Sequence, residues 1–176
     1  MNQTLEYLTM FAQLPLAMRR HFGRTLSLNE ARTQVRTQME QREANLLRMA
    51  RQCIYDWPAS PYLTLLKLAG CEYGDLERLV RQNGVEGALR RLRESGVYVT
   101  FEQFKGRQPI ERFGQTIPVS ARDFDNPGME RLFWIQTGGS TGAATTVGVN
   151  PAQVAAQAAH HLLTLSAHGL LGAPSI

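Results

Sequence analysis

The segment from Trp134 to Pro151 contains the residues best suited to chemistry. It reads WIQTGGSTGAATTVGVNP, a glycine- and hydroxyl-rich loop between two short β-like runs. Glycines have no Cβ, so backbone N–H groups can converge on an anion, and hydroxyl groups add further donors. The candidate residues for binding a nucleotide phosphate are therefore Thr137, Gly138, Gly139, Ser140, Thr141 and Gly142. A hairpin loop that binds no ligand is the alternative.

The two commonest phosphate-binding patterns do not fit this loop. A Walker A sequence requires G-x-x-x-x-G-K-[ST], but Gly142 follows Gly138 after only three residues, and Ala143 stands where the lysine is needed. The dinucleotide pattern G-x-G-x-x-G is excluded because Gly138 and Gly139 are adjacent. If the loop binds phosphate, it belongs to another class.

The sequence TGGSTGAA resembles the corresponding loop of the acyl-adenylate-forming superfamily, which typically reads TSGSTGKP or SSGTTGKP between two strands. A second likeness lies upstream. The segment ASPYLTLLKLAGCEYGDLERL (59–79) follows a long predicted helix. It resembles the N-terminal region of the phenylacetate–CoA ligase-like branch, in which an SPYY segment follows a long helix, and is similar to the acyl-protein synthetases of bioluminescence systems. The resemblance covers residues 40–150.

This resemblance implies an ATP-dependent ligase that activates a carboxylate. In that family the loop wraps the β- and γ-phosphates of ATP, which is used with Mg²⁺, while the carboxylate attacks the α-phosphate. The acyl group then passes to CoA or to another thiol or amine acceptor. Residues 137–142 would hold the phosphates, with Ser140 and Thr141 as hydroxyl donors. The resemblance assigns no catalytic residue and no metal ligand within this chain.

The chain departs from the family pattern at three positions. Gly138 replaces the usual serine or threonine, Ala143 the usual lysine or arginine, and Ala144 the usual proline. The change at Ala143 removes a cation that would pair with pyrophosphate. Two alternatives therefore stay open: a non-catalytic helical interaction or dimerisation module derived from such an enzyme, and an unrelated nucleotide-phosphate binder.

The first 96 residues are expected to be mainly helical. Apolar spacing predicts a helix over 4–21, and a capping box at Ser27 and Glu30 begins a long amphipathic helix over 28–55. Pro61 suits the first position of a short helix that ends at Gly70. Two further helices, over 75–83 and 85–95, are expected to end at glycines.

Strands are expected from Val97 onwards. VYVTF (97–101) has the composition of a strand, and residues 109–119 predict a hairpin that turns near Gly114 and Gln115. A capped helical turn is expected within 120–128, strands over 131–137 and 145–150, and a helix over 151–169. The predicted regions are 1–96, 97–130 and 131–176, and the fold class is an α+β or α/β fragment. Its last region would supply the first strands and helix of an adenylate-forming N-terminal domain.

The C-terminal region carries no Asp, Glu, Lys or Arg after Arg131. A helix of an isolated small domain needs a polar outer face, so this tail is expected to be buried, either in a larger domain or in a homodimer. A membrane span is disfavoured by five polar side chains, namely Gln153, Gln157, His160, His161 and His168. These histidines have no neighbouring carboxylate or cysteine to complete a metal site.

Composition and charge exclude further classes of function. The chain has 19 basic and 15 acidic residues, interleaved without a basic block, so no nucleic-acid partner is expected. Arg19 and Arg20 follow the first apolar stretch instead of preceding it, which is unlike a signal peptide and favours a cytoplasmic protein. Chains of the resembled family are more than twice as long. The sequence is thus interpreted as the N-terminal part of a larger ligase, with no tightly bound nucleotide and no activity alone.

Overall fold

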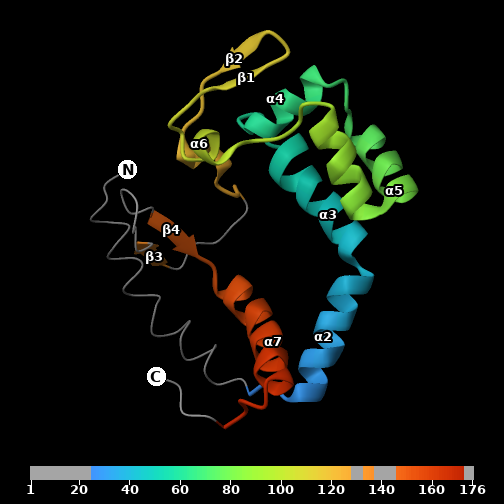
Figure 1. Ribbon diagram of the computed structural model, residues 1–176, viewed down its shortest axis with the longest axis vertical. Coiled ribbons are helices and arrows are strands. Elements are labelled where there is room, and N and C mark those ends of the chain that lie inside the picture. Colours follow the sequence, from blue (N-terminus) through green and yellow to red (C-terminus); the bar gives the residue numbers. More distant parts are fainter. Residues whose placement is uncertain (1–24, 128–132, 137–145, 173–176) are drawn as a thin grey trace. The chain divides into compact units, whose positions relative to one another are not determined.

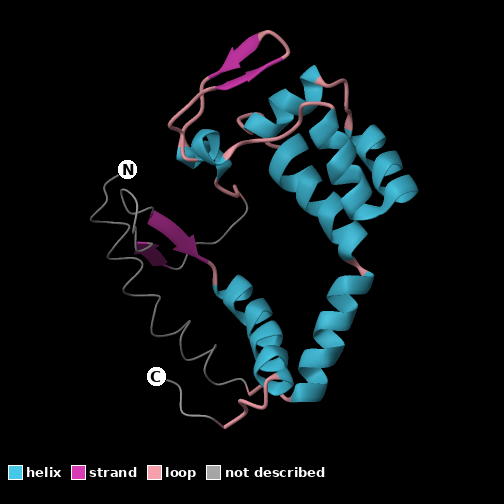
Figure 2. Ribbon diagram, viewed as in Figure 1, coloured by secondary structure: helices cyan, strands magenta, loops and turns pink. Residues whose placement is uncertain are grey.

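The computed structural model describes residues 25–127, 133–136 and 146–172. Helices predominate, with two small antiparallel strand pairs, so the chain is of the α+β class (Figure 1 and Figure 2). It divides into two compact units. One comprises residues 38–128, and the other residues 1–37 together with 129–176. The expected helix over 4–21 lies outside the described residues.

The long helix expected over residues 28–55 is confirmed, although it is interrupted once. It consists of α2 (Leu28–Glu40), α3 (Arg42–Ala50) and the π-helix η1 (Arg51–Tyr55). The interruption is at Gln41, where φ is −94° and ψ is 8°. The capping box forms as predicted: the Ser27 amide donates to Glu30 Oε2 at 2.8 Å, and the Glu30 amide donates to Ser27 Oγ at 3.3 Å.

The next helices are α4 (Pro61–Leu68) and α5 (Tyr73–Glu94), and Pro61 begins α4 as predicted. Gly84 divides α5 into two helical arms, since its φ of 67° and ψ of −179° are not helical. This matches the two helices expected on either side of Gly84. The second arm returns along the first (Figure 1), so that Leu76 and Val80 of the first arm share a core with Ala88 of the second.

The prediction of a strand over residues 97–101 is wrong, because β-structure begins at Ile110 instead of near Val97. Residues 97–100 pair with no strand among the described residues, and the short helix α6 (Phe101–Phe104) follows at once. The reason is a local capping box. The Thr100 amide donates to Gln103 Oε1 at 2.9 Å, and the Gln103 amide donates to Thr100 Oγ1 at 3.4 Å. This side-chain capping outweighs the β-propensity of valine and tyrosine.

The predicted hairpin is formed by β1 (Ile110–Arg112) and β2 (Gln115–Ile117), with Ile110 opposite Ile117. Its turn lies one residue earlier than expected. Phe113 and Gly114 both have positive φ, 54° and 72°, as a tight type I′ connection requires. The capped turn expected within 120–128 is the 3₁₀ helix η2 (Ala121–Phe124).

The C-terminal elements follow the predicted order. Strands β3 (Phe133–Gln136) and β4 (Thr146–Val149) pair antiparallel, and α7 (Pro151–Ala167) begins at the proline that the sequence indicated. The strand–loop–strand–helix arrangement is thus confirmed for the described residues.

The conformation of Gly84 leads to a stability prediction. An alanine Cβ at this position would meet nothing closer than Glu43 Oε1 at 3.8 Å, so space is available. The backbone conformation, however, is one that only glycine adopts readily, and Gly84→Ala should lower the free energy of unfolding by about 1–3 kcal/mol. Urea denaturation followed by circular dichroism measures this change.

Gly74→Ala is the matched control, because Gly74 lies in the first turn of the same helix with nothing within 4 Å of an added Cβ. It should be neutral or stabilise the protein by up to about 1 kcal/mol. A Gly84→Ala protein as stable as Gly74→Ala would show that the two arms do not depend on this glycine.

Candidate functional site

The sequence-predicted phosphate loop, Thr137–Gly142, lies outside the described residues, as do Ala143 and Ala144. Its flanks are described. The register of β3 and β4 places Gln136 opposite Thr146, and Trp134 opposite Gly148. The candidate residues are therefore in the connection between two antiparallel strands, as the sequence predicts.

Helix α7 follows β4 directly. The Asn150 carbonyl accepts the first helical bond, from the Val154 amide at 3.1 Å, and Pro151 takes the first helical position. Strand, glycine-rich connection, strand and helix thus succeed one another without a long linker. Within residues 25–127, 133–136 and 146–172, no three His, Cys, Asp or Glu side chains gather in a way that could hold a metal ion.

Most described side chains of α7 are exposed, and Ala159 is the one that is fully buried. Val154 and Leu165 are 36% and 43% exposed. They are eleven residues apart, or about three helical turns, and so lie on one face of the helix, with His161 between them. The described part of a single chain therefore does not supply the burial expected for this charge-free helix. No described helix has the length and apolar character needed to cross a bilayer.

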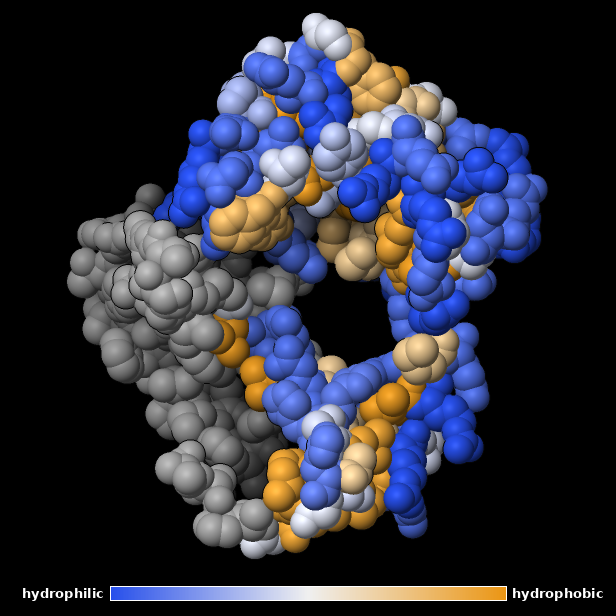
Figure 3. All heavy atoms as spheres, viewed as in Figure 1, coloured by the Kyte–Doolittle hydropathy of each residue, from blue (hydrophilic) through white to orange (hydrophobic). Residues whose placement is uncertain are grey.

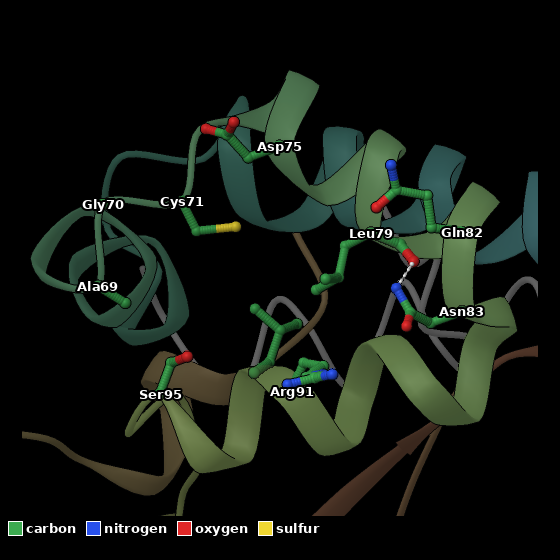
Figure 4. A pocket seen from close by; sticks show the side chains of 10 residues that line it. Ala69, Gly70, Cys71, Asp75, Leu79, Gln82, Asn83, Arg91 and Ser95 are labelled. Carbon is green, nitrogen blue, oxygen red and sulfur yellow. Dashed lines mark hydrogen bonds between the residues drawn. The ribbon is translucent and has the colours of Figure 1, made fainter.

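A surface groove of about 530 Å³ lies between the two arms of α5 and the residues that follow α4 (Figure 4). Sequence reasoning did not predict it. Leu79 of the first arm and Leu92 of the second are half-buried against the core formed by Leu76, Val80 and Ala88. Cys71 directs its thiol toward the same space. The groove therefore has an apolar floor on a fixed base.

The rim of the groove is polar, in keeping with the hydrophilic outer surface of α5 in Figure 3. Asp75 Oδ2 accepts the Glu72 amide at 3.0 Å, and Asp75 Oδ1 is ion-paired with Arg78. Asn83 Nδ2 donates to the Leu79 carbonyl at 3.0 Å. Arg91 also lines the groove, and its guanidinium forms no hydrogen bond or ion pair with another described residue. The available charge on the rim is therefore positive.

The Cys71 thiol is neutral at ordinary pH. Burial raises the pKa of Cys71, and the hydrogen bond from Tyr55 opposes part of this increase. Burial also raises the pKa of the Tyr55 hydroxyl well above its usual range, and that hydroxyl donates to the Cys71 carbonyl at 3.0 Å. A thiol that resists ionisation is a poor nucleophile, so we assign Cys71 to the apolar floor of the groove.

Comparisons of the chain with protein-family models, with curated proteins and with solved structures find no match.

The raised pKa of Cys71 predicts slow alkylation. The chain has two cysteines, so Cys53→Ser leaves Cys71 as the single thiol. Serine retains the donor that Cys53 offers to Asn126 Oδ1 at 3.2 Å. Because the thiolate is the reacting species, iodoacetamide at pH 8 should modify Cys71 several-fold more slowly than the same thiol in the urea-unfolded chain.

Mass spectrometry over a pH series checks the sign of this effect. A pKa above the usual 9.0 means that the rate in the folded chain still rises with pH after the unfolded chain has reached its plateau. Equal rates in the folded and unfolded chains at pH 8 would contradict a neutral, shielded thiol.

Proposed function

We propose that this chain forms the N-terminal part of an ATP-dependent, carboxylate-activating ligase of the acyl-adenylate-forming class. The observation that carries the proposal is the pairing of Gln136 with Thr146. TGGSTG joins these two antiparallel strands in the sequence, and α7 follows the second strand; the resembled family has its phosphate loop between two strands in the same way. The upstream likeness over residues 59–79, now known to include α4 and the start of α5, supports the same class.

In this proposal the chain binds and orients the phosphates of the nucleotide. Gly138, Gly139 and Gly142 leave room for backbone amides to approach an anion, and Ser140 and Thr141 add hydroxyl donors. Such positioned donors stabilise charge that develops during the reaction. ATP, used with Mg²⁺, would supply the α-phosphate that the carboxylate attacks, which would give an acyl-AMP with loss of pyrophosphate. A thiol or amine would then take the acyl group with release of AMP.

The donor set of this loop is uncharged, because no cation occurs after Arg131. Hydrogen bonds from neutral donors to a phosphate are weaker than those from a lysine or arginine. We therefore expect weak phosphate binding by the chain alone, with preference for ligands that carry β- and γ-phosphates. Residues beyond this chain would have to supply the remaining charge.

Nuclear magnetic resonance titration tests the loop directly. Inorganic triphosphate and ATP with Mg²⁺ should shift the amide signals of residues 137–142, whereas AMP should not, since it lacks the β- and γ-phosphates. Gly139→Val should remove the shifts by placing a branched side chain where the anion approaches. Removing one hydroxyl, in Ser140→Ala, should cost less, about 1–3 kcal/mol.

Gly74→Val, at an exposed helical position with nothing within 4 Å of an added Cβ, is the control and should bind as the unaltered chain does. In a ligase that contains this chain, carboxylate-dependent exchange of pyrophosphate into ATP should slow in Gly139→Val and not in Gly74→Val. Equal shifts with AMP and triphosphate, or equal exchange in both variants, would count against a phosphate loop.

A second function, association through α7, is favoured by the exposure of that helix. Of the described helices, α7 is the one without Asp, Glu, Lys or Arg. Its exposed face, with Val154 and Leu165, needs a partner surface that is equally free of charge. A second copy of the chain provides such a surface, because a two-fold interface brings identical patches together. We therefore propose a homodimer through this face of α7.

Leu165→Lys should convert this dimer to monomer, because a lysine ammonium would lose its hydration in a charge-free contact. Sedimentation velocity over a range of micromolar concentrations measures the change. Leu89→Lys is the control, since Leu89 is 51% exposed on α5, outside the proposed contact. A chain that sediments as a monomer before any substitution would rule out the dimer.

A further inference from the structure

The groove in α5 has the features of a small-molecule site. Its volume of about 530 Å³ is within the range of ordinary ligand pockets. Leu79 and Leu92 give it an apolar floor, and both side chains rest on the buried core of the unit. Because that core is close-packed, the floor keeps its shape when a ligand enters.

The charged side chains around the groove indicate the sign of the charge that a ligand should carry. Each oxygen of the Asp75 carboxylate already has a partner, the Glu72 amide on Oδ2 and Arg78 on Oδ1. Arg91 forms no ion pair with the described residues, and its guanidinium can pair with a carboxylate through two parallel hydrogen bonds. Gln82 is also on the rim, on the opposite arm of α5.

From these features we propose that the groove binds a small monocarboxylate with an apolar body, its carboxylate on Arg91 and its hydrocarbon part on Leu79 and Leu92. The inference does not rest on the proposed ligase function. The groove belongs to the unit of residues 38–128, whereas the glycine-rich loop belongs to the other unit. Failure of either proposal leaves the other standing.

Three ligands of equal size test the class of compound: 4-phenylbutyrate, 4-phenylbutan-1-ol and 4-phenylbutylamine. In a nuclear magnetic resonance titration, phenylbutyrate should shift the methyl signals of Leu79 and Leu92 and saturate. The alcohol and the amine should bind at least about tenfold more weakly, because they cannot form the charge-assisted pair. No saturation with phenylbutyrate, or equal binding of the alcohol, would overturn the proposal.

Charge variants test the assignment to Arg91. Arg91→Gln should weaken phenylbutyrate binding about tenfold, and Arg91→Lys should restore part of the affinity, since it retains the charge without the planar fork. Arg90→Gln is the matched control: the residue is exposed on the same helix but does not line the groove. An equal loss of affinity in Arg90→Gln would show that the effect comes from the net charge of the protein, and it would overturn the assignment of the site to Arg91.

Cys71 provides a second, independent readout. In the Cys53→Ser chain, phenylbutyrate should slow the alkylation of Cys71, because the thiol faces the space that the ligand would fill. The protection should weaken in Arg91→Gln together with the affinity. Alkylation that is unaffected at a saturating concentration would place the ligand elsewhere and refute the groove as its site.

Discussion

The reversal of α5 at Gly84 is the constraint on which the unit of residues 38–128 depends. A continuous helix would carry its second arm away from the core, whereas a φ of 67° with a ψ of −179° returns it along the first. Ala88 is then fully buried beside Val80 and Leu76. The ion pair of Arg42 with Glu86, at 2.8 Å, joins α3 to the same second arm, although both side chains are largely exposed and the pair contributes little by itself. The position of the arm is fixed mainly by the burial of apolar surface.

The same reversal creates the groove. The groove lies between these two arms, with the residues after α4 at one end of it. Its floor is apolar because Leu79, Leu92 and Cys71 also belong to the edge of the core. Its rim is polar because the next positions of each arm face water. The reversal at Gly84 thus shapes both the core of the unit and the groove beside it.

The C-terminal part of the other unit carries no Asp, Glu, Lys or Arg after Arg131. Helix α7 is held at its start by Asn150 and Pro151, which lie immediately after β4. Its surface has no ionised group to interact with water, and yet much of it is exposed in the single chain. In the proposed homodimer, burial of this surface against a second uncharged surface would drive the association. The glycine-rich loop and this helix are separated in sequence by β4, so the proposed phosphate binding and association would involve different segments of one unit.

Local interactions determined most of what the sequence alone predicted correctly. The capping box at Ser27, the proline at position 61, the helix break at Gly84 and the start of α7 at Pro151 all depend on residues within one or two turns, so they can be recognised from short patterns. The flanking strands of the TGGSTG loop were predictable for the same reason. The loop's role remains a prediction, because its residues lie outside the described part of the chain.

Tertiary structure decided what depends on partners distant in sequence. Residues 97–101 have the composition of a strand, but a strand requires a neighbouring strand, and the capping box of Thr100 with Gln103 starts a helix instead. The hairpin turn lies one residue earlier than predicted because the pairing of Ile110 with Ile117 fixes its position. This register leaves Phe113 in a left-handed conformation that its own side chain does not favour. The groove could not be predicted from the sequence, because Leu79 and Leu92 have the spacing of ordinary core positions. The packing of the two arms of α5 determines how much of each side chain remains exposed to solvent.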